Sequence, residues 1–347
     1  MTETSLEARL GAVPAPPVPT HPDIARWRPP TAADIDALHA LFAAADAVDH
    51  PTWITPRSEI ADTFDLPHID HARDSLIGLS ADGEVVALGS AFLHPARSGA
   101  LTVHLSGAVH PRLRGRGIGT GVLAWQQGRG RQQLSEVAPS LDAGEQWTAD
   151  LKVYAEETNT AQQRIAQKAG LQPERWFSTM VRAMDAAAPD VPVPDGIRIV
   201  PFSHDRDEDA RLARNDAFRD HWGSLPSQPE GWAKFVGGEF LRPDLSRIAV
   251  DADGAIVAFC LASVNEDDWA AMGVSHAYID LIGVVRSHRR RGLAPAVIAG
   301  TLAAIADAGL EQAVLDVDTA SPTGANTLYE GLGFSATERS VALVERI

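Results

Sequence analysis

The stretch HPRLRGRGIGTGVL runs from His110 to Leu123 and alternates arginine with glycine. A related stretch, HRRRGLAPAVI, occupies residues 288–298. This concentration of positive charge stands out, because 30 basic and 46 acidic residues give the chain a formal net charge of -16. In both places a strand-like apolar run precedes the glycines and a helical apolar pattern follows them. The sequence therefore predicts a strand, a glycine-rich turn and a helix, used twice.

The two arginine-glycine stretches belong to a longer internal repeat. Each half begins with a helical segment, at residues 32–46 and 206–222, and each continues with an Asp-Gly pair between apolar runs, which is typical of a hairpin. Each half also ends in a short helix after a further strand-like run. Corresponding landmarks stand 171, 175 and 163 positions apart, from Gly83 to Gly254, Arg114 to Arg289 and Gly170 to Gly333.

This repeat predicts an α/β fold of two tandem domains, each a mixed, mostly antiparallel sheet flanked by helices. We expect an N-terminal domain at residues 22–188 and a C-terminal domain at residues 195–347. Prolines and small residues suit residues 189–194 to a linker. Residues 1–21, rich in proline and alanine toward their end, are expected to form a disordered leader.

Composition excludes several classes of protein. The acidic balance disfavours nucleic acid as a partner, and no apolar run approaches the ~20 residues of a membrane span. The N-terminus lacks a basic segment followed by an apolar one, so no secretory signal is expected. The single cysteine, Cys260, lies in an apolar run and is interpreted as a buried hydrophobic residue. A chain without a possible internal disulfide fits a reducing cytoplasm.

A glycine-rich turn between a strand and a helix predicts an anion site. Free backbone N–H groups and the helix dipole favour negative charge there, and arginine provides forked donors suited to phosphate. Neither half has the Gly-Lys-Ser/Thr of a P-loop. The dinucleotide fingerprint G-x-G-x-x-G fails at Thr120 when counted from Gly115, and at Val122 when counted from Gly117.

Both halves carry the spacing R-x-x-G-x-G/A, as Arg114, Gly117 and Gly119 and as Arg289, Gly292 and Ala294. With NTLYEGLGF downstream at residues 326–334, this pattern resembles the acetyl-coenzyme A loop of the GNAT N-acetyltransferases. The duplicated layout resembles the mycothiol synthase family of actinobacterial tandem acetyltransferases. The resemblance implies acetyl-CoA as cosubstrate, held by Ile282, Val284, Val285, Arg289, Arg290, Arg291, Gly292, Leu293 and Ala294, and in the first half by Val109, Arg114, Gly115, Arg116, Gly117, Ile118 and Gly119.

The resemblance also implies where the chemistry lies. Backbone N–H groups of residues 282–285 would hold the thioester carbonyl, and Tyr329 would protonate the leaving thiolate. The first half has Ala166 at the position of Tyr329, so the C-terminal domain is expected to be catalytic and the N-terminal domain degenerate. Relatives carry a carboxylate near Tyr278, from which this sequence departs; Asp280 is the candidate general base.

Several alternatives stay open. A water chain from His276 is a second route for the base, and Asp318 is interpreted as a turn cap. No metal site is expected, since His68 and His71 lack a second ligand pair. The expected activity is transfer of an acetyl group to the primary amine of a small molecule, by direct attack in a ternary complex. A non-catalytic acyl-CoA sensor and a protein acetyltransferase are the competing interpretations. The sequence does not identify the acceptor or the oligomeric state.

Overall fold

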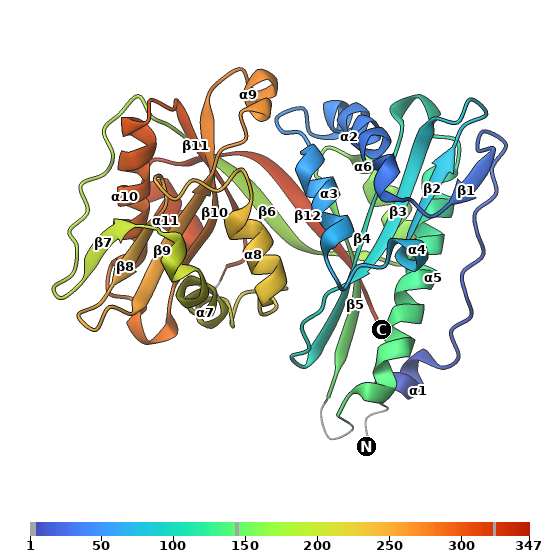
Figure 1. Cartoon of the computed structure of the whole chain (residues 1–347), viewed down its shortest axis with the longest axis horizontal. Helices are drawn as coiled ribbons and strands as arrows, with labels where there is room; N and C mark the ends of the chain where they lie inside the picture. Colours follow the sequence, from blue (N-terminus) through green and yellow to red (C-terminus); the bar gives the residue numbers. More distant parts are fainter. Residues whose placement is uncertain (1–4, 143–145, 322–323) are drawn as a thin grey trace. The chain divides into compact units, whose positions relative to one another are not determined.

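The computed structural model describes residues 5–142, 146–321 and 324–347 (Figure 1). The chain forms two compact units. Unit 1 consists of residues 1–175 and 341–347, and unit 2 consists of residues 176–340. Each unit is an α/β structure with helices against one sheet, as the repeat predicts.

Unit 1 contains a mixed sheet with the strand order β1-β2-β3-β4-β5. Neighbouring strands are antiparallel except for β4 and β5, which are parallel. Its elements are α1 (Leu6–Leu10), β1 (Arg26–Arg28), η1 (Ala32–Asp34), α2 (Ile35–Asp49), α3 (Arg57–Asp65), α4 (His71–Asp74), β2 (Ser75–Leu79), β3 (Val85–Leu93), β4 (Ala100–Val109), η2 (Pro111–Leu113), α5 (Ile118–Val137), η3 (Ala138–Ser140), β5 (Thr148–Glu156) and α6 (Thr160–Lys168).

Unit 2 repeats this plan with the strand order β6-β11-β10-β9-β8-β7. Here β10 and β11 form the parallel pair. Its elements are β6 (Gln172–Ala183), β7 (Arg198–Pro201), η4 (His204–Arg206), α7 (Asp207–Ala217), α8 (Pro229–Gly237), β8 (Arg247–Val250), β9 (Ile256–Ser263), α9 (Asp267–Met272), β10 (His276–Val284), η5 (Arg286–His288), α10 (Leu293–Asp307), β11 (Gln312–Asp318), α11 (Ala325–Gly331) and β12 (Ser335–Arg346).

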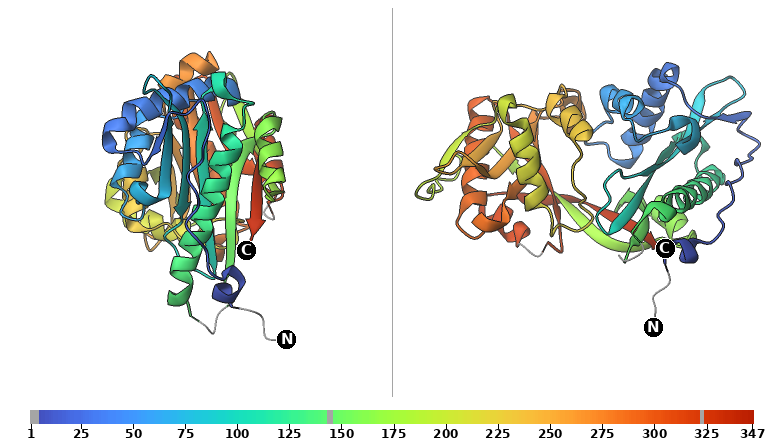
Figure 2. Two further views of the ribbon diagram at one scale, coloured as in Figure 1. Left: turned by 90° about the vertical axis from the view of Figure 1, so that its right-hand side faces the viewer. Right: turned by 60° about the horizontal axis from the view of Figure 1, so that its bottom comes forward.

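Helices cover both faces of the sheet in each unit. In unit 1, Leu38 and Leu41 of α2 pack with Ile77 of β2, whereas Ile118 and Val122 of α5 pack in a separate cluster with β3. Figure 2 shows α2 and α3 on one side of these strands and α5 running along the other. In unit 2, α10 belongs to one buried cluster, and α7 and α8 belong to another. Burial of two apolar faces is the main stabilisation of such layers.

The closing strands are exchanged between the two halves of the sequence. Strand β6, from the first half, pairs with β11 of unit 2 over the register Phe177↔Asp318 to Ala183↔Gln312. The last residues of β12, from the second half, join unit 1, where the N–H of Ile347 donates to the carbonyl of Ala149 at 2.9 Å. The structural units therefore differ from the expected domains 22–188 and 195–347. The expected linker at 189–194 lies inside unit 2, between β6 and β7.

Residues 5–21 of the expected leader lie along α5 in the structure. Helix α1 packs against α5, and further along Pro16 and Pro19 lie against the glycines of α5 at Gly128 and Gly121. A side chain at Gly128 would collide with Pro16, since its Cβ would approach the proline ring to 2.7 Å. Small residues on the helix thus create a path for the extended proline-rich segment, which composition alone does not reveal.

Candidate functional site

In unit 2 the arginine-glycine stretch forms the turn between β10 and α10. Val284 ends the strand, a 3-10 turn follows at Arg286–His288, and the helix begins at Leu293. Gly292 caps the helix with φ +79°, a left-handed conformation that glycine adopts without steric penalty. Arg290 has φ +59° and is the only non-glycine residue with positive φ in the described part of the chain. Such strained residues cluster at ligand sites.

Unit 1 builds the same turn between β4 and α5. Gly115, with φ +74°, takes the place of Arg290, and Gly117, with φ +98°, takes the place of Gly292. The first N–H groups of each following helix have no acceptor inside the helix, so they face outward at its positive end. Both turns therefore have backbone donors that face outward.

The parallel strands next to each turn separate before they end. Strands β10 and β11 pair only as far as Tyr278↔Val314, although they continue to Val284 and Asp318. Strands β4 and β5 likewise pair only from Ala100↔Thr148 to His104↔Lys152. In each unit the two parallel strands are therefore unpaired next to the glycine-rich turn, and this unpaired part is the strand opening of the unit.

The edge of β10 that faces this opening has unpaired backbone donors. The N–H of Val285 donates to the carbonyl of Val257 at 3.0 Å, on the β9 side. Because N–H groups of an extended strand point alternately to its two sides, those of Ile282 and Val284 point to the open side. Val285 is also expected to contact the cofactor, but its N–H is already bonded to Val257 and is not available as a donor. In unit 1 the N–H of His110 likewise donates to the carbonyl of Val86, at 2.9 Å.

Asp280 occupies a β-bulge in the same strand. Ile279 pairs with Ala262 and Leu281 pairs with Leu261, so Asp280 is an extra residue without a partner on β9. The Ser263 hydroxyl donates to Oδ2 of Asp280 at 2.6 Å. Burial raises the pKa of this carboxyl to about 7, and the hydrogen bond from Ser263 opposes that rise. A carboxylate that titrates near neutrality is suited to act as a general base.

The other two polar residues of this part of β10 have different roles. The Tyr278 hydroxyl donates to Oδ2 of Asp316 at 3.0 Å, and the Thr179 hydroxyl donates to Oδ1 at 2.6 Å. Burial raises the pKa of Tyr278 well above its ordinary value. His276 is buried, and its Nδ1 has no hydrogen-bond partner among the described residues. Burial lowers the pKa of His276, so this side chain is neutral at pH 7.

Tyr329 lies on α11 and is 8% exposed. Its ring contacts Phe334 edge-on, with centroids 6.1 Å apart, inside the main apolar cluster of unit 2. Burial raises the pKa of the phenol above its ordinary value. Tyr329 therefore keeps its proton at neutral pH. The equivalent position in unit 1 is Ala166, which is 1% exposed.

Three residues near these sites were missed by reading the sequence. Ser263 was unremarkable until the structure placed it against Asp280. Asp49 and Asp220 bond to the first arginines of the two turns, Arg114 and Arg289. A signal for the aspartates did exist: they stand 171 positions apart, the same spacing as the two Asp-Gly turns.

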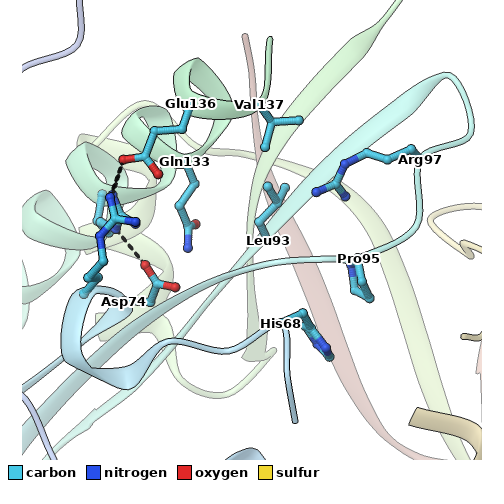
Figure 3. Close-up of a pocket in the computed structure, with 10 residues that line it drawn as sticks. His68, Asp74, Leu93, Pro95, Arg97, Gln133, Glu136 and Val137 are labelled. Atoms are coloured by element: carbon cyan, nitrogen blue, oxygen red, sulfur yellow. Dashed lines mark hydrogen bonds and ion pairs between the residues drawn. The ribbon is translucent and has the colours of Figure 1, made fainter. Parts of the chain in front are cut away.

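A separate cavity of about 260 Å³ lies in unit 1 (Figure 3). It is bordered by α4, by the end of β3 and by the C-terminal part of α5. Four of its charged groups are paired with one another: Arg129 donates to Asp74 at 2.7 Å and to Glu136 at 3.1 Å, and Arg73 donates to Glu136 at 2.6 Å. Arg97 instead donates to the backbone carbonyl of Ala96 at 3.1 Å. Arg129 lies 11 residues along α5 from Ile118, which is about 17 Å at the usual helical rise. The cavity is therefore distinct from the turn.

The remaining sequence candidates have structural roles. Cys260 is fully buried, as predicted, and burial raises the pKa of its thiol to about 12. Asp318 caps the following turn by accepting the N–H of Ala320 at 2.9 Å. His71 bonds to the hydroxyls of Thr63 and Ser75. Over the described ranges, no group of three possible ligands is placed to hold a metal ion, and no helix has the length and hydropathy to cross a membrane.

Comparison with known proteins agrees with this geometry. Residues 208–334 match the family model described as the acetyltransferase (GNAT) family. The chain is 30% identical, over 88% of its length and 94% of the relative's, to the mycothiol acetyltransferase of Thermobispora bispora. A second relative with that name, from Salinispora arenicola, is 30% identical over 91% of this chain and 95% of its own.

Solved structures show the same fold. A GCN5-related N-acetyltransferase from Sphaerobacter thermophilus has 26% identity and a TM-score of 0.67, over 92% of this chain and 95% of its own. A tandem GNAT protein from the clavulanic acid biosynthesis pathway has 17% identity and a TM-score of 0.65, over 92% of this chain and 98% of its own. The chain therefore belongs to the GNAT family of acetyltransferases.

Proposed function

We propose that unit 2 transfers the acetyl group of acetyl-CoA to the primary amine of a small molecule, by direct attack within a ternary complex. The observation that carries this proposal is Asp280, a bulged carboxylate with a pKa near 7 beside an open strand edge. A general base with this pKa is useful to an enzyme that deprotonates an ammonium group near neutral pH. It has no evident structural purpose.

Residues of this chain would hold acetyl-CoA at the turn and along the open edge of β10. Backbone N–H groups of residues 290–294 and the exposed side chains of Arg290 and Arg291 support binding of the diphosphate. The N–H groups of Ile282 and Val284 would bind the pantetheine arm and the thioester carbonyl. Glycine at position 292 leaves open space where a Cβ would stand, so a ligand can approach the backbone closely.

Two side chains would move or hold protons. Acetyl-CoA supplies the acetyl group as a thioester, whose C–S bond breaks as the C–N bond to the acceptor forms. Asp280 accepts the proton that the attacking amine loses. Tyr329 donates a hydrogen bond, and finally its proton, to the departing sulfur. Because burial raises the pKa of Tyr329, it keeps that proton until a thiolate develops.

Unit 1 would bind the coenzyme without reacting. It has the turn and the strand opening, but Ala166 replaces the tyrosine and β4 pairs with β3 without a bulge. These two differences, the missing tyrosine and the missing bulge, favour the second role, that of a non-catalytic acyl-CoA site. It is proposed for unit 1 alone.

The acceptor is selected by the segment after α7. Arg214 donates to the carbonyl of Leu225 at 2.7 Å and Arg211 to that of Ser227 at 2.8 Å, which fixes residues 223–228 near the C-terminal end of this helix. A panel of primary amines, headed by the amine precursor of mycothiol, should be assayed for thiol release from acetyl-CoA and for the mass of the product. Acetyl-CoA binding without turnover of any amine in the panel would favour the sensor interpretation instead.

A further inference from the structure

The first arginine of each glycine-rich turn is held by an aspartate of its own unit. In unit 2, Arg289 donates to Oδ2 of Asp220 at 2.8 Å and to the carbonyl of Ala217 at 2.8 Å. In unit 1, Arg114 donates to both carboxylate oxygens of Asp49, at 2.7 and 2.8 Å. Its Nε also donates to the carbonyl of Val109 at 2.9 Å.

The two aspartates are equivalent residues. Asp49 ends α2 and Asp220 follows α7. They stand 171 positions apart, and the arginines stand 175 apart, like other landmarks of the repeat. The same ion pair thus occurs in two units whose neighbouring side chains have diverged. Recurrence in both units argues for a role that the two turns share.

These contacts use the donors that a phosphate would need. A guanidinium binds an oxyanion best through two parallel N–H groups, and in Arg114 both terminal nitrogens already bond to Asp49. The pKa of Asp220 is lowered by its hydrogen bond with Arg289. By contrast, Arg290 and Arg291 are exposed, and neither has an ion pair with any described residue.

The end of α7 holds the turn at a second point. Asp216 accepts the backbone N–H of Arg286 at 2.8 Å, which fixes the residue just after β10. Asp220 also lies 3.3 Å from the Arg286 guanidinium. The turn is therefore held at its entry, before the residues whose N–H groups face outward.

We propose that Arg289 with Asp220, and Arg114 with Asp49, are positioning pairs, which hold each turn in the shape that binds the coenzyme's phosphates. The proposal rests on the proposed function, because it assumes that the turns bind acetyl-CoA. It revises the expectation that Arg289 and Arg114 contact the cofactor directly. The direct phosphate ligands among the arginines are then Arg290 and Arg291.

Replacing Asp220 by asparagine distinguishes a phosphate-binding role of Arg289 from a positioning role, because the two roles change the affinity for coenzyme in opposite directions. If Arg289 bound phosphate directly, removing the neighbouring carboxylate would free the guanidinium and make the site more positive, so coenzyme would bind more tightly. If the pair positions the turn, loss of the carboxylate loosens the turn, and binding weakens.

Calorimetry with coenzyme A on the full chain tests this directly. We expect Asp220→Asn and Arg289→Gln each to weaken one class of sites about tenfold, and the double variant to be no weaker than either, since residues of one pair are not additive. Arg289→Lys keeps the charge but loses the fork, and it should also weaken binding. Asp49→Asn should affect the other class of sites. Asp209→Asn is the matched control, because it removes a charge from α7 at an ion pair with Arg206 that does not touch the turn.

Four results would contradict the positioning role or the proposed function. Unchanged or tighter binding by Asp220→Asn would overturn the proposal, and so would unchanged binding by Arg289→Lys if the asparagine variant does not fold. Equal weakening by Asp209→Asn would also overturn it, because the loss of binding would then not depend on the arginine–aspartate pair. Failure of the wild-type protein to bind coenzyme A would instead contradict the proposed function.

Discussion

Units 1 and 2 share a turn, a strand opening and an arginine–aspartate pair, but the part of the strand that follows its last pair with the parallel neighbour is one residue longer in unit 2. His104 and Tyr278, the last residues paired across the openings, stand 174 positions apart. Val109 and Val284, the last residues of the two strands, stand 175 apart. The additional residue is Asp280, at the bulge. In unit 1, β3 and β4 pair without any shift of register.

This comparison separates two kinds of function. Anion binding depends on backbone N–H groups and glycine conformation, which both units retain. Proton transfer depends on individual side chains, and those differ between the units. A β-bulge re-aims a side chain without disturbing the rest of the sheet, so one additional residue is enough to supply the base proposed for unit 2. On the proposed function, unit 1 keeps the ability to bind coenzyme while the chemistry is confined to unit 2.

The turns also differ in the surroundings of the arginine that precedes the helix-capping glycine, Arg116 in unit 1 and Arg291 in unit 2. In unit 1, Arg116 donates to Asp23 at 3.1 Å, and its carbonyl contacts His21, at the end of the leader, at 2.9 Å. In unit 2, Arg291 has no such partner among the described residues. The turn of unit 2 is thus the more open of the two to an incoming anion.

The largest expected effect is that of Asp280→Asn. We expect kcat/KM to fall about 10³-fold, within the usual range for general acid–base catalysis. In the wild type, kcat/KM should rise as the pH passes through about 7, because the base must be ionised. Ser106→Ala in unit 1, at a position next to the missing bulge, is the control and should retain activity. An asparagine variant with the parental rate would place the base elsewhere, with His276 the next candidate.

Tyr329→Phe should leave coenzyme binding intact and slow turnover about 10²-fold, as expected for loss of an acid. The reciprocal change Ala166→Tyr in unit 1 should not create a second active site, because that unit has no bulged carboxylate. Steady-state kinetics of both variants would test the assignment. If the phenylalanine variant matched the wild type across the pH range, Tyr329 would be a packing residue.

Gly292→Ala should weaken coenzyme binding by about tenfold, because alanine resists the left-handed conformation that shapes the turn. Gly254→Ala is a matched control for backbone strain: its φ of +83° is close to the +79° of Gly292, and a Cβ would meet nothing within 4 Å at either position. Both should lower stability similarly, and only the first should affect binding. Gly117→Ala should weaken the site of unit 1 and spare turnover. Loss of turnover with Gly117→Ala and not with Gly292→Ala would mean that catalysis belongs to unit 1.

The smallest expected effect concerns stability. Folding raises the pKa of Asp280 from an ordinary 3.8 to about 7, so the folded protein binds a proton that the unfolded chain has lost. The resulting stabilisation is complete below pH 4 and is lost as the pH rises toward 7. Asp280→Asn should therefore raise Tm at pH 8 by a few degrees, roughly the shift of 1 kcal/mol in a domain of this size, and less at pH 5. Parallel Tm curves for the two proteins would contradict this.

Much of the fold was predictable because the repeat marks equivalent elements twice. The helical apolar pattern expected after the second arginine-glycine stretch is found in α10, where Leu293, Val297, Leu302 and Ile305 are buried in the core of unit 2. The Asp-Gly turns have the positive φ that hairpins require, +82° at Gly83 and +83° at Gly254. Local patterns of this kind depend on residues close in the sequence, and so they are legible there.

Long-range features were not predictable. Pairing of β6 with β11 depends on competition between strands of similar pattern, and a repeat alone predicts that each half closes its own sheet. The bond between Ser263 and Asp280 joins residues 17 positions apart across a bulge, which alternation of residues does not reveal. The arginines were identified from the sequence, but their partners follow only from the path of the chain.

The exchange of closing strands has a consequence for how the protein is made. Residues 341–346 complete the sheet of unit 1, yet they are synthesised after all of unit 2. While the chain is still on the ribosome, β5 has one edge without its final neighbour, and exposed strand edges invite pairing with other chains. Arg346, which donates to both carboxylate oxygens of Asp150 at 2.7 and 2.8 Å, is synthesised only after unit 2. Synthesis of unit 1 is thus started before unit 2 and completed after it.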